Sequence, residues 1–278
     1  MPSRIDVHYL CHVPYYSTNR RVESVADTET AAPLGFDIIR QMAREVLNLK
    51  QAAEHVHIDE NELRHFAQRG EIEATKRGDD WFFEHRALDE WAQRNLLAAG
   101  EKDLKEQHRV MMDENRRADK CGWGVADLFS VETVDLAVQA KAKGGILRDM
   151  TDLADRGGKV YDPEGLFKEL VDREEAASTA IGEGVALLHP RFHDPYLFED
   201  SFIAYGRSAR PIFFGAADGE GTRHFFLICS TNHEEHLHIL ARLAILAHGT
   251  DLMERLDAVE TPEDAIAAIR DCETEYRK

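Results

Sequence analysis

Two short helices with a tight turn between them are the first elements that the order of apolar and polar residues predicts. The first helix is predicted from apolar residues that recur at helical spacing: Leu49, Ala52, Ala53 and Val56. Asp59 is followed three residues later by Glu62, and this pair forms a capping box for the second helix. Gly70 ends that helix.

A β-hairpin and a further helix are predicted next. The runs 72–76 and 81–83 flank the sequence RGDD, which is typical of a hairpin turn. Residues 87–93 then return to a helical period. The order helix, turn, helix, β-wing, helix is the layout of a winged DNA-binding unit.

A connector is predicted after this unit. The helical pattern runs from Leu88 to Lys120 with a weak point at Gly100. Leu97, Leu104 and Met111 fall at heptad spacing, which is too few repeats to establish a coiled coil. A connector that pairs two chains and a solvated linker helix are both open interpretations.

The second half of the chain alternates between strands and helices. A helix over 141–156 is stopped by Gly157 and Gly158, and Asp162 with Pro163 provides the cap and first position of another helix. Further helices are predicted to begin at Glu234, Asp251 and Pro262. The strand candidates are 131–138, 184–189, 202–206, 211–214 and 224–229. Strands interleaved with helices predict an α/β sandwich, in which one sheet has helices on its faces.

The composition agrees with a multidomain chain. Its 278 residues are 43% apolar, which is enough for one large core or two smaller ones. We expect a mobile N-terminal segment over 1–35, a mainly α helix-turn-helix domain over 36–97, a helical linker over 98–122 and an α/β domain over 123–278.

Cysteine usage and hydropathy predict a cytoplasmic protein. No window contains the roughly 18 uninterrupted apolar residues that a membrane helix needs, so no membrane partner is expected. The start of the chain has no compact apolar run of the secretory type. The four cysteines lie far apart and are expected to be free thiols: Cys11, Cys121, Cys229 and Cys272.

The first unit resembles the excisionase-like helix-turn-helix family related to MerR regulators. The resemblance covers about fifty residues and depends on QAAEHVHIDENELRHFAQRGEIEATKRG followed by ALDEWAQ. It implies that the second helix enters the major groove of DNA and that the wing contacts the backbone. Arg64, His65 and Arg69 would then lie near bases, and Lys76 and Arg77 near phosphates.

The charge of this unit departs from the family pattern. Residues 44–97 contain 8 basic and 12 acidic side chains, a net of −4, and the wing carries Asp79 and Asp80. The whole chain has a net charge of −18, which opposes unassisted attraction to nucleic acid. We therefore expect weak DNA binding, or binding only as a dimer. A helix-turn-helix kept as a protein-docking module is the alternative.

The second half resembles the fructose/mannitol and nitrogen-regulatory type of enzyme IIA domain of the phosphoenolpyruvate phosphotransferase system. The resemblance covers roughly 127–276 and depends on LVDREEAASTAIGEGVALLHPR and STNHEEHLHILARLAILAHGTDLMERLDAVETPEDAIAAI. It implies that His189, at the end of a strand, receives a phosphoryl group from the phosphocarrier protein HPr. His236, which opens a helix, would lie beside it, and Arg173 would belong to the same pocket.

The residue types suit that chemistry. A neutral imidazole has one lone-pair nitrogen near physiological pH, so it can attack phosphorus without a separate base, a metal or a cofactor. Arg173 and His236 could stabilise the equatorial oxygens, and Ser178 and Thr179 offer donors close by in sequence. A position at the end of a strand is expected to hold His189 rigidly while leaving it accessible to solvent.

Two neighbours of His189 differ from the family pattern. The family typically reads Pro-His-Gly, whereas here Leu188 precedes the histidine and Pro190 follows it, so position 190 has no backbone N–H. A domain that kept the fold and lost the chemistry is therefore an alternative.

A zinc site is a further alternative. His233, His236 and His238 lie in HEEHLH, and His189 and His193 could join them. The spacing His-Glu-Glu-His is one residue short of the metalloprotease helix motif, so no metal is expected. For His233 and His238 taken singly, we expect a solvated helix face.

Three functions follow from these features. The first is a regulator, in which HPr phosphorylates the IIA-like domain. The helix-turn-helix then communicates the phosphorylation state of the phosphotransferase system to DNA or to a partner protein. The second is a phosphotransfer protein that passes the group to a separate IIB protein. The third is an interaction protein that is not phosphorylated. The region 120–278 holds 17 basic against 29 acidic residues, a net of −12, which would suit docking to a basic patch on a phosphocarrier.

Overall fold

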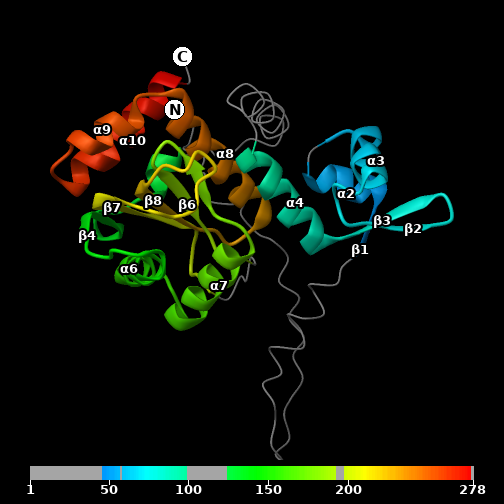
Figure 1. Cartoon of the computed structure of the whole chain (residues 1–278), viewed down its shortest axis with the longest axis horizontal. Coiled ribbons are helices and arrows are strands. Elements are labelled where there is room, and N and C mark those ends of the chain that lie inside the picture. Colours follow the sequence, from blue (N-terminus) through cyan, green and yellow to red (C-terminus); the bar gives the residue numbers. More distant parts are fainter. Residues whose placement is uncertain (1–45, 57, 99–123, 192–196, 277–278) are drawn as a thin grey trace, which may run out of the picture.

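The computed structural model describes residues 46–56, 58–98, 124–191 and 197–276. These residues form a small N-terminal unit and a larger C-terminal unit (Figure 1). The predicted N-terminal segment 1–35 and the part of the predicted connector beyond residue 98 lie outside the described residues.

The N-terminal unit is the predicted helix-turn-helix with a wing. Asp59 caps the second helix, because its side chain accepts a hydrogen bond from the backbone N–H of Asn61 at 2.8 Å. Gly70 ends this helix with φ of 73°, a left-handed conformation that favours glycine. The elements are β1 (Val46–Asn48), α2 (Leu49–Val56), α3 (Glu60–Arg69), β2 (Thr75–Arg77), β3 (Asp80–Glu84) and α4 (His85–Ala98).

The wing contains one strand more than the sequence pattern predicted. β2 and β3 form the expected hairpin, and β1 pairs with the other edge of β3 to give the order β1-β3-β2. The apolar side chains of the helices pack against Phe83 in one small core. Its buried members are Ala52, Ala53, Val56, Leu63, Ala67, Ile72, Phe83, Leu88 and Trp91.

The C-terminal unit is built on a mixed five-stranded sheet in the order β4-β7-β8-β6-β5. β4 runs parallel to β7 and β6 runs parallel to β8, whereas the β7–β8 and β5–β6 pairs are antiparallel. The strands are β4 (Val134–Val138), β5 (Ala180–Gly182), β6 (Val185–Leu188), β7 (Phe202–Ile212) and β8 (Thr222–Cys229). The predicted strand 202–206 and the first two residues of the predicted strand 211–214 belong to one strand, which ends at Ile212. Residues 131–133 form a 3-10 turn before β4.

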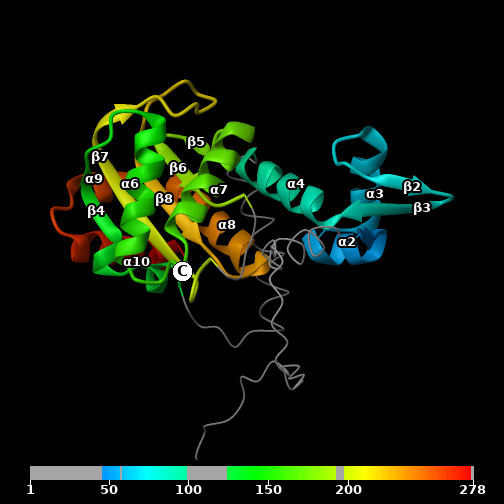
Figure 2. The same ribbon diagram turned by 90° about the horizontal axis from the view of Figure 1, so that it is seen from below.

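Helices cover both faces of this sheet (Figure 2). Because side chains alternate along a strand, Val185 and Leu187 of β6 face α8, α9 and α10, while Ala186 and Leu188 face α6 and α7. The predicted α/β sandwich is confirmed. The helices are α6 (Lys143–Arg156), α7 (Pro163–Ala176), α8 (His233–Gly249), α9 (Leu252–Ala258) and α10 (Pro262–Tyr276).

A buried ion pair joins α8 to α10. Glu273 accepts from Arg242, with 3.0 Å between Glu273 Oε1 and Arg242 Nη2, and both side chains are almost fully buried. The same carboxylate accepts from the backbone N–H groups of Val125 at 3.1 Å and Ala126 at 3.4 Å. These hydrogen bonds fix the start of the unit to its last helix.

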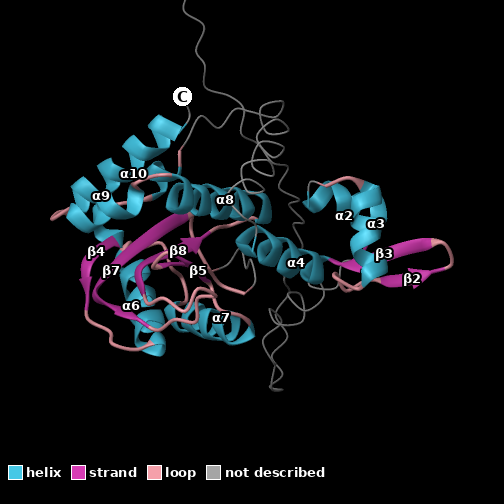
Figure 3. Ribbon diagram, turned by 45° about the horizontal axis from the view of Figure 1, so that its top comes forward, coloured by secondary structure: helices cyan, strands magenta, loops and turns pink. Residues whose placement is uncertain are grey.

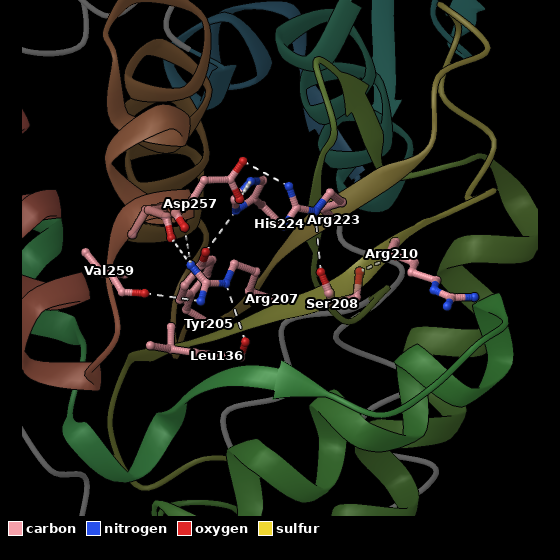
Figure 4. A network of polar contacts seen from close by, with 10 residues as sticks. Leu136, Tyr205, Arg207, Ser208, Arg210, Arg223, His224, Asp257 and Val259 are labelled. Atoms are coloured by element: carbon pink, nitrogen blue, oxygen red, sulfur yellow. Dashed lines mark hydrogen bonds and ion pairs between the residues drawn. The ribbon is translucent and has the colours of Figure 1, made fainter.

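A second polar network lies on β7 and β8 beside the end of α9 (Figure 4). Nδ1 of the buried His224 ring is 2.8 Å from the hydroxyl oxygen of Tyr205, and Nε2 of the same ring is 3.5 Å from Oδ1 of Asp257. Burial lowers the pKa of His224 to about 4, although the charge of Asp257 acts in the opposite direction. His224 is therefore neutral at pH 7.

Among the described residues, no helix is both long enough and apolar enough to cross a lipid bilayer.

Candidate functional site

His189 follows the last residue of β6, and alternation along the strand turns its ring towards α8. Its Nδ1 lies 2.8 Å from the carbonyl oxygen of Leu187. Since a carbonyl oxygen only accepts, Nδ1 carries the proton and Nε2 holds the lone pair. Nε2 is therefore the nucleophilic atom of this residue.

Arg173 of α7 holds that nitrogen. Its Nε donates to Nε2 of His189 at 2.9 Å, and its Nη1 donates to the carbonyl oxygen of Ala177 at 2.9 Å. Burial lowers the pKa of Arg173, and the charges of Glu174 and Glu90 act against that shift. A guanidinium titrates so far above neutrality that it stays charged.

His236 lies in the first turn of α8 beside His189. The two ring centroids are 5.0 Å apart with the ring planes at 60°, and both side chains are fully buried. Nδ1 of His236 is 3.2 Å from the hydroxyl of Ser230. Asn232 caps this helix by accepting from the backbone N–H of Glu235 at 2.9 Å, which fixes the turn that carries His236.

Thr179 is held by a carboxylate in the same part of the fold. Its hydroxyl and its backbone N–H both donate to Oε2 of Glu174, at 2.5 and 3.0 Å. Glu174 in turn pairs with Lys143 at 2.7 Å. The carbonyl oxygen of Thr179 also accepts a hydrogen bond from the backbone N–H of Leu187. Thr179 therefore helps to fix β6, the strand that His189 follows.

The N-terminal unit contacts His189 through α4. Helix α4 lies against α8 (Figure 3), and Oε1 of Gln93 is 3.2 Å from Nε2 of His189. One turn earlier on α4, Glu90 pairs with Arg191 at 3.2 Å. The expectation that His189 is open to solvent is wrong: its exposed fraction is 0%, and Gln93 of α4 is one of the residues that lie against its ring.

Sequence reasoning missed the α4 contacts for a physical reason. Gln93 and His189 are 96 positions apart, and a glutamine on a helix has no pattern that indicates which partner it faces. The paired charges of Glu90 and Arg191 are likewise ordinary surface residues in the sequence.

The predicted DNA-contacting residues lie on α3 and the wing, away from the five-stranded sheet (Figure 1). Arg64 is half-buried and hydrogen-bonds Asn61, whereas the others are exposed: His65, Arg69, Lys76 and Arg77. Most of these basic groups have partners. Arg69 pairs with Glu71, and Lys76 and Arg77 lie over the rings of Trp81 and Phe82 at 5.8 and 5.3 Å.

The proposed zinc set of the sequence is not brought together as a group. His189 and His236 meet, but His233 contacts Asp89 of α4 at 3.1 Å, and its side chain is only 9% exposed. The expectation of a solvated face is therefore wrong for His233, because α4 covers it. His238 is half-buried, and His193 lies outside the described residues.

These features define a class of protein in which a helix-turn-helix domain precedes an α/β domain, and the α/β domain brings an arginine and a second histidine to a buried histidine at the end of a strand. The chain belongs to the family described as phosphoenolpyruvate-dependent sugar phosphotransferase system, EIIA 2, which matches residues 127–272. The description helix-turn-helix domain matches residues 46–96. Both predicted resemblances are confirmed at the level of the family.

Individual relatives match the same part of the chain. The PTS system fructose-specific EIIABC component of Bacillus subtilis (strain 168) is 29% identical over 147 residues, which are 52% of this chain and 22% of that protein. The nitrogen regulatory protein of Bradyrhizobium diazoefficiens is 31% identical over 137 residues, which are 48% of this chain and 86% of that protein. This chain thus spans less than a quarter of the Bacillus relative's length.

A solved structure is similar as well. The crystal structure of nitrogen regulatory protein IIA-Ntr from Neisseria meningitidis has 24% sequence identity to this chain and a TM-score of 0.48. The match covers 52% of this chain and 98% of that chain.

Proposed function

We propose that this protein is a phosphotransferase-linked regulator in which His189 accepts a phosphoryl group from HPr and the helix-turn-helix unit responds to it. The observation that carries the proposal is the position of Gln93, 3.2 Å from the lone-pair nitrogen of His189. Nε2, the atom that would accept phosphorus, is therefore in contact with α4, the last helix of the helix-turn-helix unit. A change at either one therefore acts on the other.

The transfer that we propose is balanced in atoms and charge. The bond between phosphorus and the imidazole of the donor breaks while a bond to Nε2 of His189 forms, and the proton on Nδ1 stays in place. Arg173, which already contacts Nε2, is placed to hold an equatorial oxygen of the moving group. His236 supplies a second ring beside the same nitrogen.

Coupling follows from the lack of space at Nε2. A phosphorus atom bonded to that nitrogen, with three oxygens around it, would take the volume that the Gln93 amide fills. The phosphoryl group also adds negative charge close to Glu90, which pairs with Arg191 at this interface. Phosphorylation would then displace α4 and free the helix-turn-helix unit, with its exposed Arg69 and Lys76, to bind elsewhere.

The partner of the freed unit is proposed to be DNA, bound weakly or by a dimer. The exposed basic residues of α3 and the wing support that assignment, whereas the net charge of −4 over 44–97 limits the affinity. A gel-shift assay at about 50 and 200 mM salt tests it, because true phosphate contacts make affinity fall steeply over that range.

Phosphate incorporation is the direct test of the acceptor. The full chain is incubated with phosphoenolpyruvate, enzyme I and HPr, and its intact mass is measured. We expect one phosphoryl group on the wild-type chain, complete loss in His189→Ala, and retention in His248→Ala, a control on the far end of α8. No added mass on the wild type, or full incorporation in His189→Ala, contradicts the proposal.

Delivery of the group to a separate IIB protein is the second candidate, because the Bacillus relative is named as a sugar-specific component. Rapid loss of phosphate when a IIB protein is added would favour this candidate over a regulator. A chain that stays unphosphorylated in every condition would be an interaction protein that kept the fold.

A further inference from the structure

A cluster of three histidines and one aspartate lies at the contact between the two units, outside the His189 pocket. The residues come from α2, α4 and α8, and their positions in the chain span almost 180 residues. The members are His55, His85, Asp89 and His233. None of them has a role in the phosphoryl transfer proposed above.

The nitrogens of this cluster converge on one carboxylate. Oδ1 of Asp89 lies 2.7 Å from Nε2 of His55 and 3.1 Å from Nε2 of His233. The His55 and His233 rings stack with centroids 4.4 Å apart and planes at 16°, so the two ring planes are nearly parallel. Nδ1 of His85 is 3.4 Å from the other oxygen, Oδ2.

These separations are close to those around a small cation. Zinc bonds of about 2.0–2.2 Å in a tetrahedron place ligand atoms roughly 3.3 Å apart. One ligand atom from each of His55, Asp89 and His233 can be chosen so that all three lie within 4.8 Å of one another, and all three residues are half-buried. Imidazole and carboxylate groups together are the donors that zinc and related divalent transition metals bind.

We propose that His55, Asp89 and His233 bind a divalent transition-metal ion that joins the helix-turn-helix unit to the IIA domain. His85 is placed next to the same carboxylate, so it or a water molecule completes a tetrahedral site. Two of the ligands belong to the N-terminal unit and one to the C-terminal unit, so the ion bridges the two.

The position of the site gives the ion a consequence. Asp89 and Gln93 are four residues apart on α4, and His233 and His236 are three apart on α8, so each pair shares one helix face. The metal site and the covered His189 are thus neighbouring contacts between the same two helices. An ion at Asp89 holds Gln93 over His189, and this consequence, unlike metal binding itself, rests on the proposed function.

Metal binding is tested on the full chain without a polyhistidine tag. The protein is stripped with a chelator and titrated with Zn²⁺ in a calorimeter, and Co²⁺ is added separately to record its visible absorption. We expect one equivalent of Zn²⁺ and the intense absorption of four-coordinate Co²⁺. Less than one equivalent of Zn²⁺ on the wild type overturns the proposal.

Variants from both units assign the ligands. His55→Gln and His233→Gln are each expected to weaken Zn²⁺ binding by at least about 100-fold, because each removes a ligand. His65→Gln, an exposed histidine on α3, is the matched control and keeps the wild-type affinity. Binding kept in both ligand variants overturns the site, and loss in His233→Gln alone places the ion on α8 without a bridge, which also overturns it.

Circular dichroism of the stripped variants confirms that each is folded before titration. Because a substitution on α2 and one on α8 lie in different units, failure of one variant to fold leaves the other to decide. No phosphocarrier is present in these titrations, so a chain that takes no phosphate can still bind the metal. If both activities exist, Zn²⁺ slows phosphate incorporation in the wild type and has no such effect in His55→Gln.

Discussion

The two units of this chain bury their side chains in very different amounts. The C-terminal unit has a core on each face of its sheet and a buried ion pair between α8 and α10. The described part of the N-terminal unit has one core of nine buried apolar residues, and polar side chains of α4 contact the C-terminal unit. The IIA domain therefore carries its own stability, whereas the interface uses hydrogen bonds and ion pairs that can be exchanged.

That difference suits a reversible switch. Among the described residues, contacts across the interface join single polar groups, such as Gln93 to His189 and Glu90 to Arg191. Each such contact contributes about 1 kcal/mol or less in net terms. A phosphoryl group can displace contacts of this size without unfolding either unit.

The largest effect is expected inside the C-terminal unit. Glu273→Gln removes the carboxylate partner of the buried Arg242, and loss of one member of a buried pair costs about 3–5 kcal/mol. Urea unfolding should show this loss in the transition of the IIA domain. Glu275→Gln, which removes an exposed partner of Arg255, is the control and should change stability little. Equal effects of the two variants would contradict the comparison.

The pH dependence of stability is expected to be the next largest effect, and it again belongs to the C-terminal unit. The pKa of His224 is about 4 in the folded chain and 6.5 in the unfolded chain. Between these pH values the unfolded chain therefore binds more protons than the folded chain. The stability from His224 is complete above pH 6.5 and is lost as pH falls towards 4, by about 3 kcal/mol.

Urea titrations of wild type and His224→Gln at pH 7.5 and 4.5 measure this contribution. The wild type should lose more stability between the two pH values than the variant does, because only the wild type has this group. Parallel losses in both proteins would show that His224 is not held neutral by burial.

The smallest effect is expected at the interface. Gln93→Ala removes the side chain that lies 3.2 Å from Nε2 of His189 and opens space there, which shifts the covered state by about 1 kcal/mol. The initial rate of phosphate incorporation should rise about fivefold, while the unfolding free energy of the IIA domain stays the same. Gln68→Ala on the exposed face of α3 is the control. A rate equal to the wild-type rate would show that Gln93 does not limit access.

Local signals predicted most of the secondary structure. Asp162 and Pro163 mark the start of α7, and the Asp162 side chain accepts from the backbone N–H of Gly165. The sequence pattern broke β7 into two because residues 207–210 contain two arginines. The strand continues there because Arg207 hydrogen-bonds carbonyl oxygens of Leu136 and Val259.

The site was predicted only as far as a family pattern reaches. His189, His236 and Arg173 were found from a motif, and the structure brings the three together. Gln93 and Asp89 were not found, because contacts between separate units depend on docking and leave no periodic pattern in the sequence. For the same reason, His233 was expected on a solvated helix face, and no role was predicted for His55 and His85, which also face Asp89.

Hydrogen exchange of α4 tests the central claim most directly. In the proposed mechanism, α4 lies against His189 and must leave when this residue is phosphorylated. Exchange of the backbone amides of residues 85–98 is measured by mass spectrometry in the wild-type chain, before and after incubation with phosphoenolpyruvate, enzyme I and HPr. Faster exchange in this helix after phosphate addition, and no change in His189→Ala, is the predicted result. A chain that carries phosphate on His189 with α4 as protected as before would contradict the account.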